Sequence, residues 1–338
     1  MKYIPGILGA AALLASFTFS TQAQDEGGEA AAADVGGAAA EAPEAPAAPV
    51  KPRPAEIMPL TPKNLLLDIV RAGDGFVAVG DRGGIITSPD GKNWTQAPVP
   101  VRAALTSVAF ADAQHGWAVG HDAAIVATTD GGKSWTLQNF APQLEKPLLD
   151  VLFIDASTGF TVGAYGLFLK TTDGGASWAE VEAPSIRAEE VHFNALVKLG
   201  DGSLFVAGES GMLAVSSDQG QTWTKLTSPY ESSLFGALPV GDKGALIYGL
   251  RGNVYIAQDV RANKWTKLET QSVASMFGGA TLADGRLAMV GLNGVVLLAT
   301  ADGKVTTKQT PTGTPLSAAV AMDGGLLAVG ESGVQPIP

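Results

Sequence analysis

The sequence predicts an all-β fold, a seven-bladed β-propeller of four-stranded blades. A glycine that ends a short apolar run recurs at intervals of 39 to 45 residues. It falls at Gly80, Gly120, Gly163, Gly208, Gly249, Gly291 and Gly330. A period of this length with several short strands is typical of propellers, in which each copy forms one blade. Seven copies therefore predict seven blades.

Each copy contains four short strand candidates. The innermost strands are apolar runs such as Leu105–Phe110 and Leu148–Ile154. The second strands end at the recurring glycine, as in Gly116–Gly120, and third strands such as Ala124–Thr129 follow. Short apolar runs bounded by Gly and Asp indicate strands that are buried on both faces. The fourth strands are predicted to start at Trp94, Trp135, Trp178, Trp223 and Trp265, with a Trp-free copy from Val305.

The seventh copy contains too few residues for a fourth strand. Only Val-Gln-Pro-Ile-Pro follows Gly333, whereas Glu56–Leu60 precedes the first inner strand and has no place in its own blade. An open strand edge favours unwanted pairing with other chains. We therefore expect the ring to be closed by this N-terminal segment, acting as the outer strand of blade seven. Pro59 is acceptable there because outer strands are edge strands.

Residues 1–23 are predicted to form a secretory signal peptide. Lys2 supplies a positive start, Ile4–Phe19 is apolar, and Thr21-Gln22-Ala23 offers small residues for cleavage. The apolar run of 16 residues is shorter than the roughly 20 needed to span a membrane, although a retained anchor is the alternative. We expect cleavage after Ala23, a periplasmic location, and no direct membrane span afterwards.

Residues 24–55 are predicted to form a disordered linker, followed by the propeller over residues 56–338. Residues 24–57 contain 12 Ala, seven Asp or Glu and no aromatic residue. Such a segment cannot bury enough apolar surface to offset the entropy lost on ordering.

The composition excludes several functions. The net charge of −11 and the lack of a Lys/Arg cluster argue against nucleic-acid binding. The absence of cysteine excludes disulfides and a lipid-modified cysteine. His115, His121 and His192 are scattered, and no metal-ligand spacing, catalytic triad or phosphate loop is found. We therefore expect no metal and no cofactor.

A second repeated phrase precedes each tryptophan. Thr128–Trp135, Thr171–Trp178 and Ser216–Trp223 fit the pattern Ser/Thr-x-Asp-x-Gly-x-Ser/Thr-Trp, and Ser88–Trp94 is one residue shorter. The pattern resembles the Asp-box of BNR-repeat propellers, which include bacterial sialidases. An Asp that caps the N–H groups of a turn explains it without catalysis. The residues predicted to be structural are Asp90, Asp130, Trp135, Asp173, Trp178, Asp218 and Trp223.

The longer phrase from Leu105 to Trp135 is more specific. It resembles the photosystem II assembly and stability factor family of seven-bladed propellers, over about residues 58–338. The resemblance implies a non-enzymatic scaffold that binds a membrane-protein complex of the cell envelope. Some bacterial relatives resemble periplasmic companions of resistance-nodulation-division (RND) transporters, so an accessory subunit of such a transporter is one possible role.

One face of the ring is expected to vary from blade to blade. The turns after the second strands and the long connections into the inner strands open on that face, where binding residues are usually found on a regular scaffold. The candidate partner-binding residues are Arg82, Arg102, His121, Tyr165, Arg187, Glu209, Arg251 and Asn293. The alternative is that they are ordinary solvated turn residues.

A glycan-binding protein or a glycosidase of the sialidase type remains the alternative function. Sialidase chemistry needs an arginine cluster and a tyrosine nucleophile with an acidic partner. Arginines are present, but Tyr165, Tyr230, Tyr248 and Tyr255 show no recognisable paired Glu, and no insertions between blades build a pocket. We therefore expect that the protein is not an enzyme.

Overall fold

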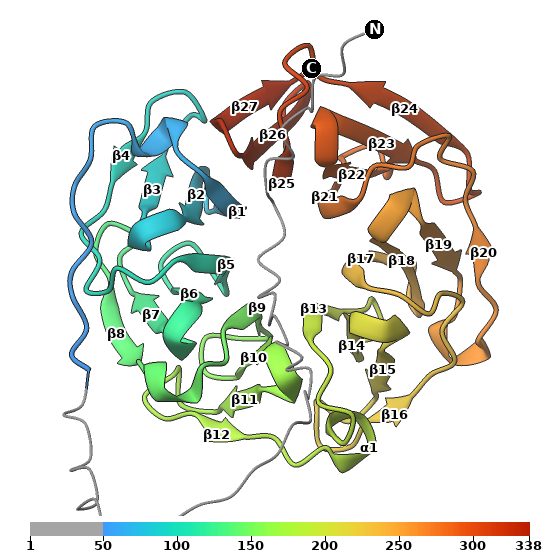
Figure 1. Ribbon diagram of the computed structural model, residues 1–338, viewed down its shortest axis with the longest axis horizontal. Helices are drawn as coiled ribbons and strands as arrows, with labels where there is room; N and C mark the ends of the chain where they lie inside the picture. Colours follow the sequence, from blue (N-terminus) through green and yellow to red (C-terminus); the bar gives the residue numbers. More distant parts are fainter. Residues whose placement is uncertain (1–49) are drawn as a thin grey trace, which may run out of the picture. The chain divides into compact units, whose positions relative to one another are not determined.

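The computed structural model describes residues 50–338, which form a ring of seven sheets (Figure 1). The predicted signal peptide and most of the predicted linker lie outside the described residues. Among the residues described, no helix has both the length and the apolar character required to cross a membrane. The all-β, seven-bladed prediction is confirmed.

The first six blades are four-stranded antiparallel sheets whose strands follow the chain from the axis to the rim. Blade one has β1 (Leu66–Ala72), β2 (Gly75–Gly80), β3 (Ile85–Ser88) and β4 (Thr95–Gln96). Blade two has β5 (Leu105–Phe110), β6 (Gly116–Gly120), β7 (Ile125–Thr128) and β8 (Thr136–Asn139). Blade three has β9 (Leu148–Phe153), β10 (Gly159–Gly163), β11 (Phe168–Thr171) and β12 (Ala179–Glu180). Blade four has β13 (Phe193–Lys198), β14 (Leu204–Gly208), β15 (Leu213–Ser216) and β16 (Thr224–Lys225).

The remaining blades continue the ring back to blade one. Blade five has β17 (Leu234–Val240), β18 (Gly244–Gly249), β19 (Val254–Ala257) and β20 (Thr266–Lys267). Blade six has β21 (Met276–Thr281), β22 (Leu287–Gly291), β23 (Val295–Ala299) and β24 (Val305–Gln309). Blade seven has β25 (Leu316–Met322), β26 (Gly325–Gly330) and β27 (Gly333–Ile337).

The helical elements are short and lie in turns and connections. Six 3-10 turns follow the second strands of blades one to six, at Asp81–Gly83, His121–Ala123, Ala164–Gly166, Glu209–Gly211, Leu250–Gly252 and Leu292–Gly294. Three further 3-10 turns are η1 (Thr61–Lys63), Pro142–Leu144 and Val260–Ala262, and α1 (Pro184–Arg187) precedes blade four.

The hydrophobic core lies between the blades rather than within one central layer. Second strands such as β6 and β10 are buried along their whole length, because a neighbouring blade covers each of their faces. One cluster joins Val77 and Val79 of blade one to Val108 and Val126 of blade two. Burial of apolar surface stabilises by about 25 cal/mol per Å². Lateral packing between blades therefore holds the ring together.

Closure by Glu56–Leu60 is not what the structure shows. Within residues 50–338, blade seven has three strands, and the N-terminal segment forms no strand. It lies instead against blade one, where the Met58 N–H donates to Gln96 Oε1 (2.8 Å) and Gln96 Nε2 donates to the Glu56 carbonyl (2.9 Å). The Ala55 N–H also donates to the Val99 carbonyl (2.9 Å). The Gln96 amide thus accepts one hydrogen bond from the backbone of this segment and donates another to it, which explains why the segment follows blade one.

The junction of blades seven and one is closed by packing and by η1. Leu66 and Phe76 of blade one share a cluster with Leu327 and Val329 of blade seven. The turn η1 lies against the start of β27, so closely that a Cβ at Gly333 would sit 2.0 Å from the Pro62 carbonyl oxygen. Residues 61–63 thus take the place of a connection between blades seven and one.

Candidate binding face and axial channel

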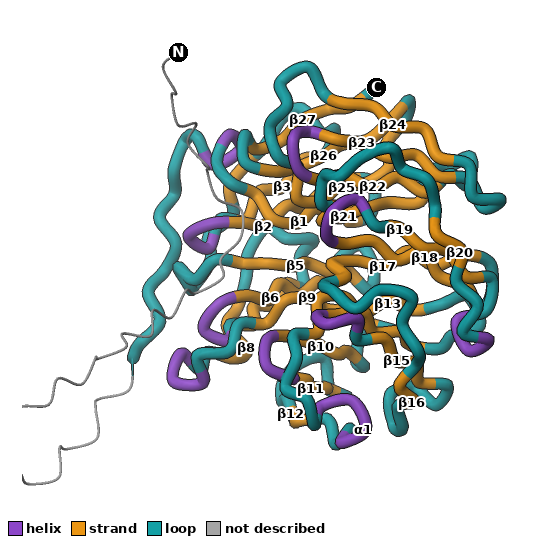
Figure 2. Tube along the Cα trace, turned by 45° about the vertical axis from the view of Figure 1, so that its right-hand side comes forward, coloured by secondary structure: helices purple, strands orange, loops and turns teal. Residues whose placement is uncertain are grey.

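The two faces of the ring are built from different loops. The 3-10 turns after the second strands lie beside the connections that enter the inner strands, as the His121 N–H···O=C Ala104 bond (2.9 Å) shows. We call this the connection face; its turns are drawn as short purple segments in Figure 2. The Asp-box turns lie beside the turns between first and second strands, as in the Gly131 N–H···O=C Gln114 bond (3.0 Å). They form the opposite, Asp-box face.

A left-handed residue occupies the middle of each of the six 3-10 turns that follow the second strands. The residues and their φ angles are Arg82 (54°), Asp122 (59°), Tyr165 (53°), Ser210 (52°), Arg251 (56°) and Asn293 (59°). This conformation costs most residues about 1–2 kcal/mol and is free of that cost for glycine. Asn and Asp tolerate the left-handed conformation because their short side chains can hydrogen-bond to the nearby backbone, whereas Arg and Tyr, as at Arg82, Tyr165 and Arg251, cannot do so. Backbone strain of this kind clusters at functional sites.

All eight predicted partner-binding residues lie in loops of the connection face. Six are in the 3-10 turns, Arg102 is in the connection from β4 to β5, and Arg187 ends α1 in the connection from β12 to β13. The structure brings two of them together across blades three and four. The Tyr165 ring, 49% exposed, stands edge-on to His192 at 4.8 Å, and Glu209 Oε2 accepts the His192 N–H (3.2 Å).

The four predicted arginines differ in how far the protein already uses them. Arg187 donates to the Gly166 and Val181 carbonyls (2.9 and 2.7 Å) and to Glu180 (2.8 Å), so it holds the connection in place. Arg102 forms an ion pair with Glu56 (3.0 Å). Among the residues that the structure describes, the ion pair of Arg82 is with its neighbour Asp81 (3.5 Å). Arg251 makes no ion pair with the residues described here. Arg82 and Arg251 are therefore the arginines best placed to bind another molecule.

The inner strands line an axial channel that the sequence prediction did not single out. Each inner strand contains a β-bulge near its start, in all seven blades. The bulged residues all line one cavity of about 200 Å³, and they are Leu67, Thr106, Leu149, Asn194, Phe235, Phe277 and Ser317. Asp68 and Asp150, each following a bulge, line it as well. In the sequence, this site is indicated only by an aspartate at equivalent places in two otherwise apolar inner strands, Asp68 in β1 and Asp150 in β9.

The two channel carboxylates connect neighbouring blades. Each accepts the N–H of the residue that follows it and one N–H of the next blade, from Val108 (2.9 Å) for Asp68 and from Leu196 (2.8 Å) for Asp150. Ser107 Oγ lies between them, 3.1 Å from Asp68 and 2.8 Å from Asp150. A hydroxyl has one proton to donate, so both contacts are favourable only when one carboxyl is protonated.

The channel environment raises the pKa of both carboxyl groups. Desolvation is the main cause, and it raises the pKa of Asp68 from 3.8 to about 7 and that of Asp150 from 3.8 to about 6. The charge of Asp150 adds to the increase at Asp68, while the N–H bonds oppose it. The inner strands surround the carboxyl groups of Asp68 and Asp150, so water solvates their charged forms poorly.

The Asp-box aspartates show the opposite behaviour, because their own turns hydrogen-bond them. Asp130 accepts from the Ser134 hydroxyl (2.6 Å), the Thr128 hydroxyl (2.7 Å) and the Ser134 N–H (3.0 Å). These bonds lower the pKa of Asp130 to about 2, and equivalent bonds do the same for Asp173 and Asp218. Asp90 is held in the same way in the shorter turn.

The Asp-box tryptophans pack against the turns and against phenylalanines of inner or third strands. Trp135 is buried, donates its ring N–H to the Gly132 carbonyl (3.1 Å) and meets Phe110 edge-on. Trp223 is buried against Phe168, and Trp178 packs on Phe153. The Asp and Ser/Thr side chains of the motif are thus bonded within their own turns, whereas the ring N–H groups of Trp178 and Trp223 have no partner among the described residues.

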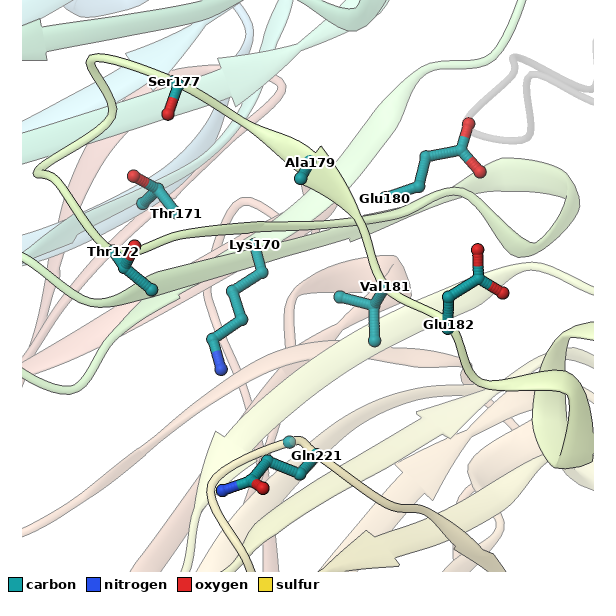
Figure 3. Close-up of a pocket in the computed structure, with 10 residues that line it drawn as sticks. Lys170, Thr171, Thr172, Ser177, Ala179, Glu180, Val181, Glu182 and Gln221 are labelled. Atoms are coloured by element: carbon teal, nitrogen blue, oxygen red, sulfur yellow. The ribbon is translucent and has the colours of Figure 1, made fainter.

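A second cavity, of about 310 Å³, lies at the rim between blades three and four (Figure 3). Lys170 extends toward the loop of Gln221, with its Nζ 3.4 Å from the Gln219 carbonyl and 5.1 Å from the centre of the Phe160 ring. Figure 3 shows the carboxylates of Glu180 and Glu182 directed away from Lys170. Acidic and basic groups therefore do not converge in this groove. Within residues 50–338, no group of three or more His, Cys, Asp or Glu residues is placed to hold a metal ion.

Comparison with known proteins identifies the family. The model of the family described as "Photosynthesis system II assembly factor YCF48" matches residues 86–145 and 137–311. A solved structure of YCF48 bound to a D1 peptide is 17% identical, with a TM-score of 0.66, and the match covers 86% of this chain and 97% of that one. YCF48 from Cyanidioschyzon merolae is 16% identical, with a TM-score of 0.65 and coverages of 82% and 97%.

Other propellers share the fold alone. The WD40 propeller domain of Doa1 is 14% identical, with a TM-score of 0.65, and the match covers 80% of this chain and 90% of that one. A search of curated protein sequences gives no match. The family model spans about two thirds of the residues, a shorter range than the 58–338 of the motif resemblance. The family that the resemblance indicated is confirmed, and the chain belongs to the YCF48 family of photosystem II assembly factors.

Proposed function

We propose that this protein is an exported, periplasmic assembly factor whose connection face binds an extended segment of a membrane protein of the cell envelope. Its family is described as one of assembly factors, and a relative with the same fold is bound to a peptide of D1. The export signal predicted over residues 1–23 supports the location.

The left-handed positions of the connection face carry this proposal. Arg82, Tyr165 and Arg251 occupy a conformation that favours glycine, so their side chains are kept at a cost to stability. They are directed outward from separate blades, with little use inside the protein. An arginine side chain makes several hydrogen bonds from one planar group, which suits the carbonyl and carboxylate groups of an extended peptide.

The partner class is the finer part of the proposal. A subunit of an RND-family transporter is the candidate that the sequence resemblance suggests, and an unassembled membrane protein of another complex is equally compatible with the face. Both would present an extended segment outside the membrane. A glycan ligand would instead support the alternative function, a BNR-type lectin or glycosidase.

Affinity capture tests the proposal. Immobilised protein lacking residues 1–23 is incubated with a detergent extract of envelope membranes, and the captured proteins are identified by mass spectrometry. We expect a membrane protein to be retained, and the double variant Arg82→Glu, Arg251→Glu to weaken its capture at least tenfold, or about 1.4 kcal/mol.

The matched control reverses two charges on the other face. Lys92 and Lys133 lie in Asp-box turns and are exposed, so the double variant Lys92→Glu, Lys133→Glu should capture within about twofold of the wild type. Lys225 is unsuitable as a control because it is paired with Glu189, in a connection of the binding face. Capture that is lost in the control and kept in the arginine variant would refute the assignment of the face.

A further inference from the structure

The axial channel is asymmetric around the ring axis. On the side of blades one to three, Asp68, Ser107 and Asp150 line it. On the side of blades five and six, Phe235 and Phe277 lie at the bulges, with ring centres 5.4 Å apart, and each is followed by a glycine, Gly236 or Gly278. The bulges follow directly on the connections, so the aromatic and the acidic side of the channel both begin next to the connection face.

The channel carries negative charge that the protein does not neutralise. None of the residues that line the cavity is Lys, Arg or His. Charges removed from water are costly unless they are paired, and the backbone N–H bonds of the two carboxylates provide only partial compensation. A cation with an apolar body would match this lining on both sides.

A tyrosine in the channel wall gives an independent indication of a ligand. The Tyr248 side chain lines the channel and the residue is 3% exposed; its hydroxyl makes no hydrogen bond to the residues described here but is not among their fully buried polar atoms, so it opens into the channel. Its hydroxyl would lie 2.2 Å from a Cβ at Gly236 and 3.3 Å from a Cβ at Gly279, so the two glycines make room for it at the wall. The hydroxyl of a largely buried side chain normally has a partner, either protein or water. A donor entering the channel would supply one.

We propose that the axial channel binds one basic side chain, lysine or arginine, of the partner segment on the connection face. This inference rests on the proposed function. The aliphatic stem would lie against Phe235 and Phe277, and the charged head would meet Asp68 and Asp150 with the Tyr248 hydroxyl as a further acceptor. The channel would thereby fix the register of a segment that the outer arginines hold by its backbone.

Binding should strengthen as the pH rises. The titratable groups that line the channel are Asp68, Asp150 and Tyr248, and burial raises the pKa of Tyr248, which therefore stays a neutral hydroxyl. A cationic head binds the ionised carboxylates, so it must displace the proton that they hold at low pH. The affinity should increase between pH 5.5 and pH 8.

The test uses two blocked pentapeptides, acetyl-Gly-Gly-Lys-Gly-Gly-amide and its norleucine counterpart, in titration calorimetry with the protein lacking residues 1–23. We expect the lysine peptide to bind at least tenfold more tightly at pH 8 and to lose this preference at pH 5.5. Asp150→Asn should reduce its affinity at least tenfold. The matched variant Asp74→Asn, which removes an exposed charge from the turn between β1 and β2, should change it less than twofold.

Two further variants keep the test valid if Asp150→Asn does not fold. Tyr248→Phe and Phe235→Leu leave the carboxylate bonds intact, and each should weaken the lysine peptide at least threefold. Equal binding of the two peptides would overturn the inference, and so would saturable binding of CaCl₂ or KCl without a preference for lysine. If the peptide fails to bind while envelope capture persists, only the channel inference fails. If the peptide binds but no membrane protein is captured, the proposed function fails instead.

Discussion

Replacing Asp68 with asparagine should change how the stability of the propeller depends on pH. The pKa of Asp68 is raised to about 7 in the folded protein, from 3.8 for the free side chain. The folded state therefore prefers the protonated form. The resulting stabilisation is fully present below pH 4 and is lost as the pH rises through about 7. The full difference corresponds to about 4 kcal/mol.

The wild type should therefore be the more stable protein at low pH and should lose this advantage over Asp68→Asn at high pH. Between pH 5 and pH 8.5 the wild type should lose about 2–3 kcal/mol relative to Asp68→Asn, because only the carboxyl ionises in this range. The amide keeps one acceptor oxygen, so one of the N–H groups from Ile69 and Val108 loses its partner, at a cost of about 1–3 kcal/mol at every pH. The variant should be less stable at pH 5 and equal or more stable at pH 8.5.

Urea unfolding followed by tryptophan fluorescence at four pH values measures this difference. Titrations outside the channel are common to both proteins and cancel in the comparison. The Asp-box aspartates are separated from this range, because their lowered pKa values remove stability only below about pH 4. Parallel stability curves for the two proteins would refute the raised pKa of Asp68.

Three further outcomes follow from the turns and the N-terminal segment. Asp130→Ala should lower the free energy of unfolding by about 1–2 kcal/mol through loss of a turn cap, and capture of the partner should persist; loss of capture at full stability would contradict a structural role. Tyr165→Gly should raise the free energy of unfolding by up to about 1 kcal/mol while weakening capture, and a less stable variant would argue against backbone strain. Gln96→Ala should expose residues 55–60 to limited proteolysis with little effect on unfolding, and unchanged protection would show that other contacts hold the segment.

The blades could be predicted from the sequence because each is formed by one continuous stretch of the chain. Apolar runs ending at glycines such as Gly120 and Gly163 specify buried second strands, and the Asp-box specifies its own turn. The path of Glu56–Leu60 could not be predicted, since it depends on side-chain bonds from Gln96 to a passing backbone.

The candidate functional residues also divide into those that the sequence repeat predicts and those that depend on the folded structure. The outer positions such as Arg251 follow from the repeat alone, because they occupy the same place in successive turns. The channel required the strand register. Only the bulges determine that Asp68 and Asp150, distant in sequence, both line the axis and share contacts with Ser107.

The three-stranded blade seven has a consequence for how the ring assembles. In the described part of the chain, no strand is shared between blade seven and blade one, so their junction can separate without breaking a sheet hydrogen bond. Contacts across it, such as Arg71 to the Ala321 carbonyl, join residues 250 positions apart. Contacts so distant in sequence form late, because a long loop must close first. Folding can therefore proceed blade by blade as an open arc, and the closing of this one junction turns seven neighbouring sheets into a cooperative ring.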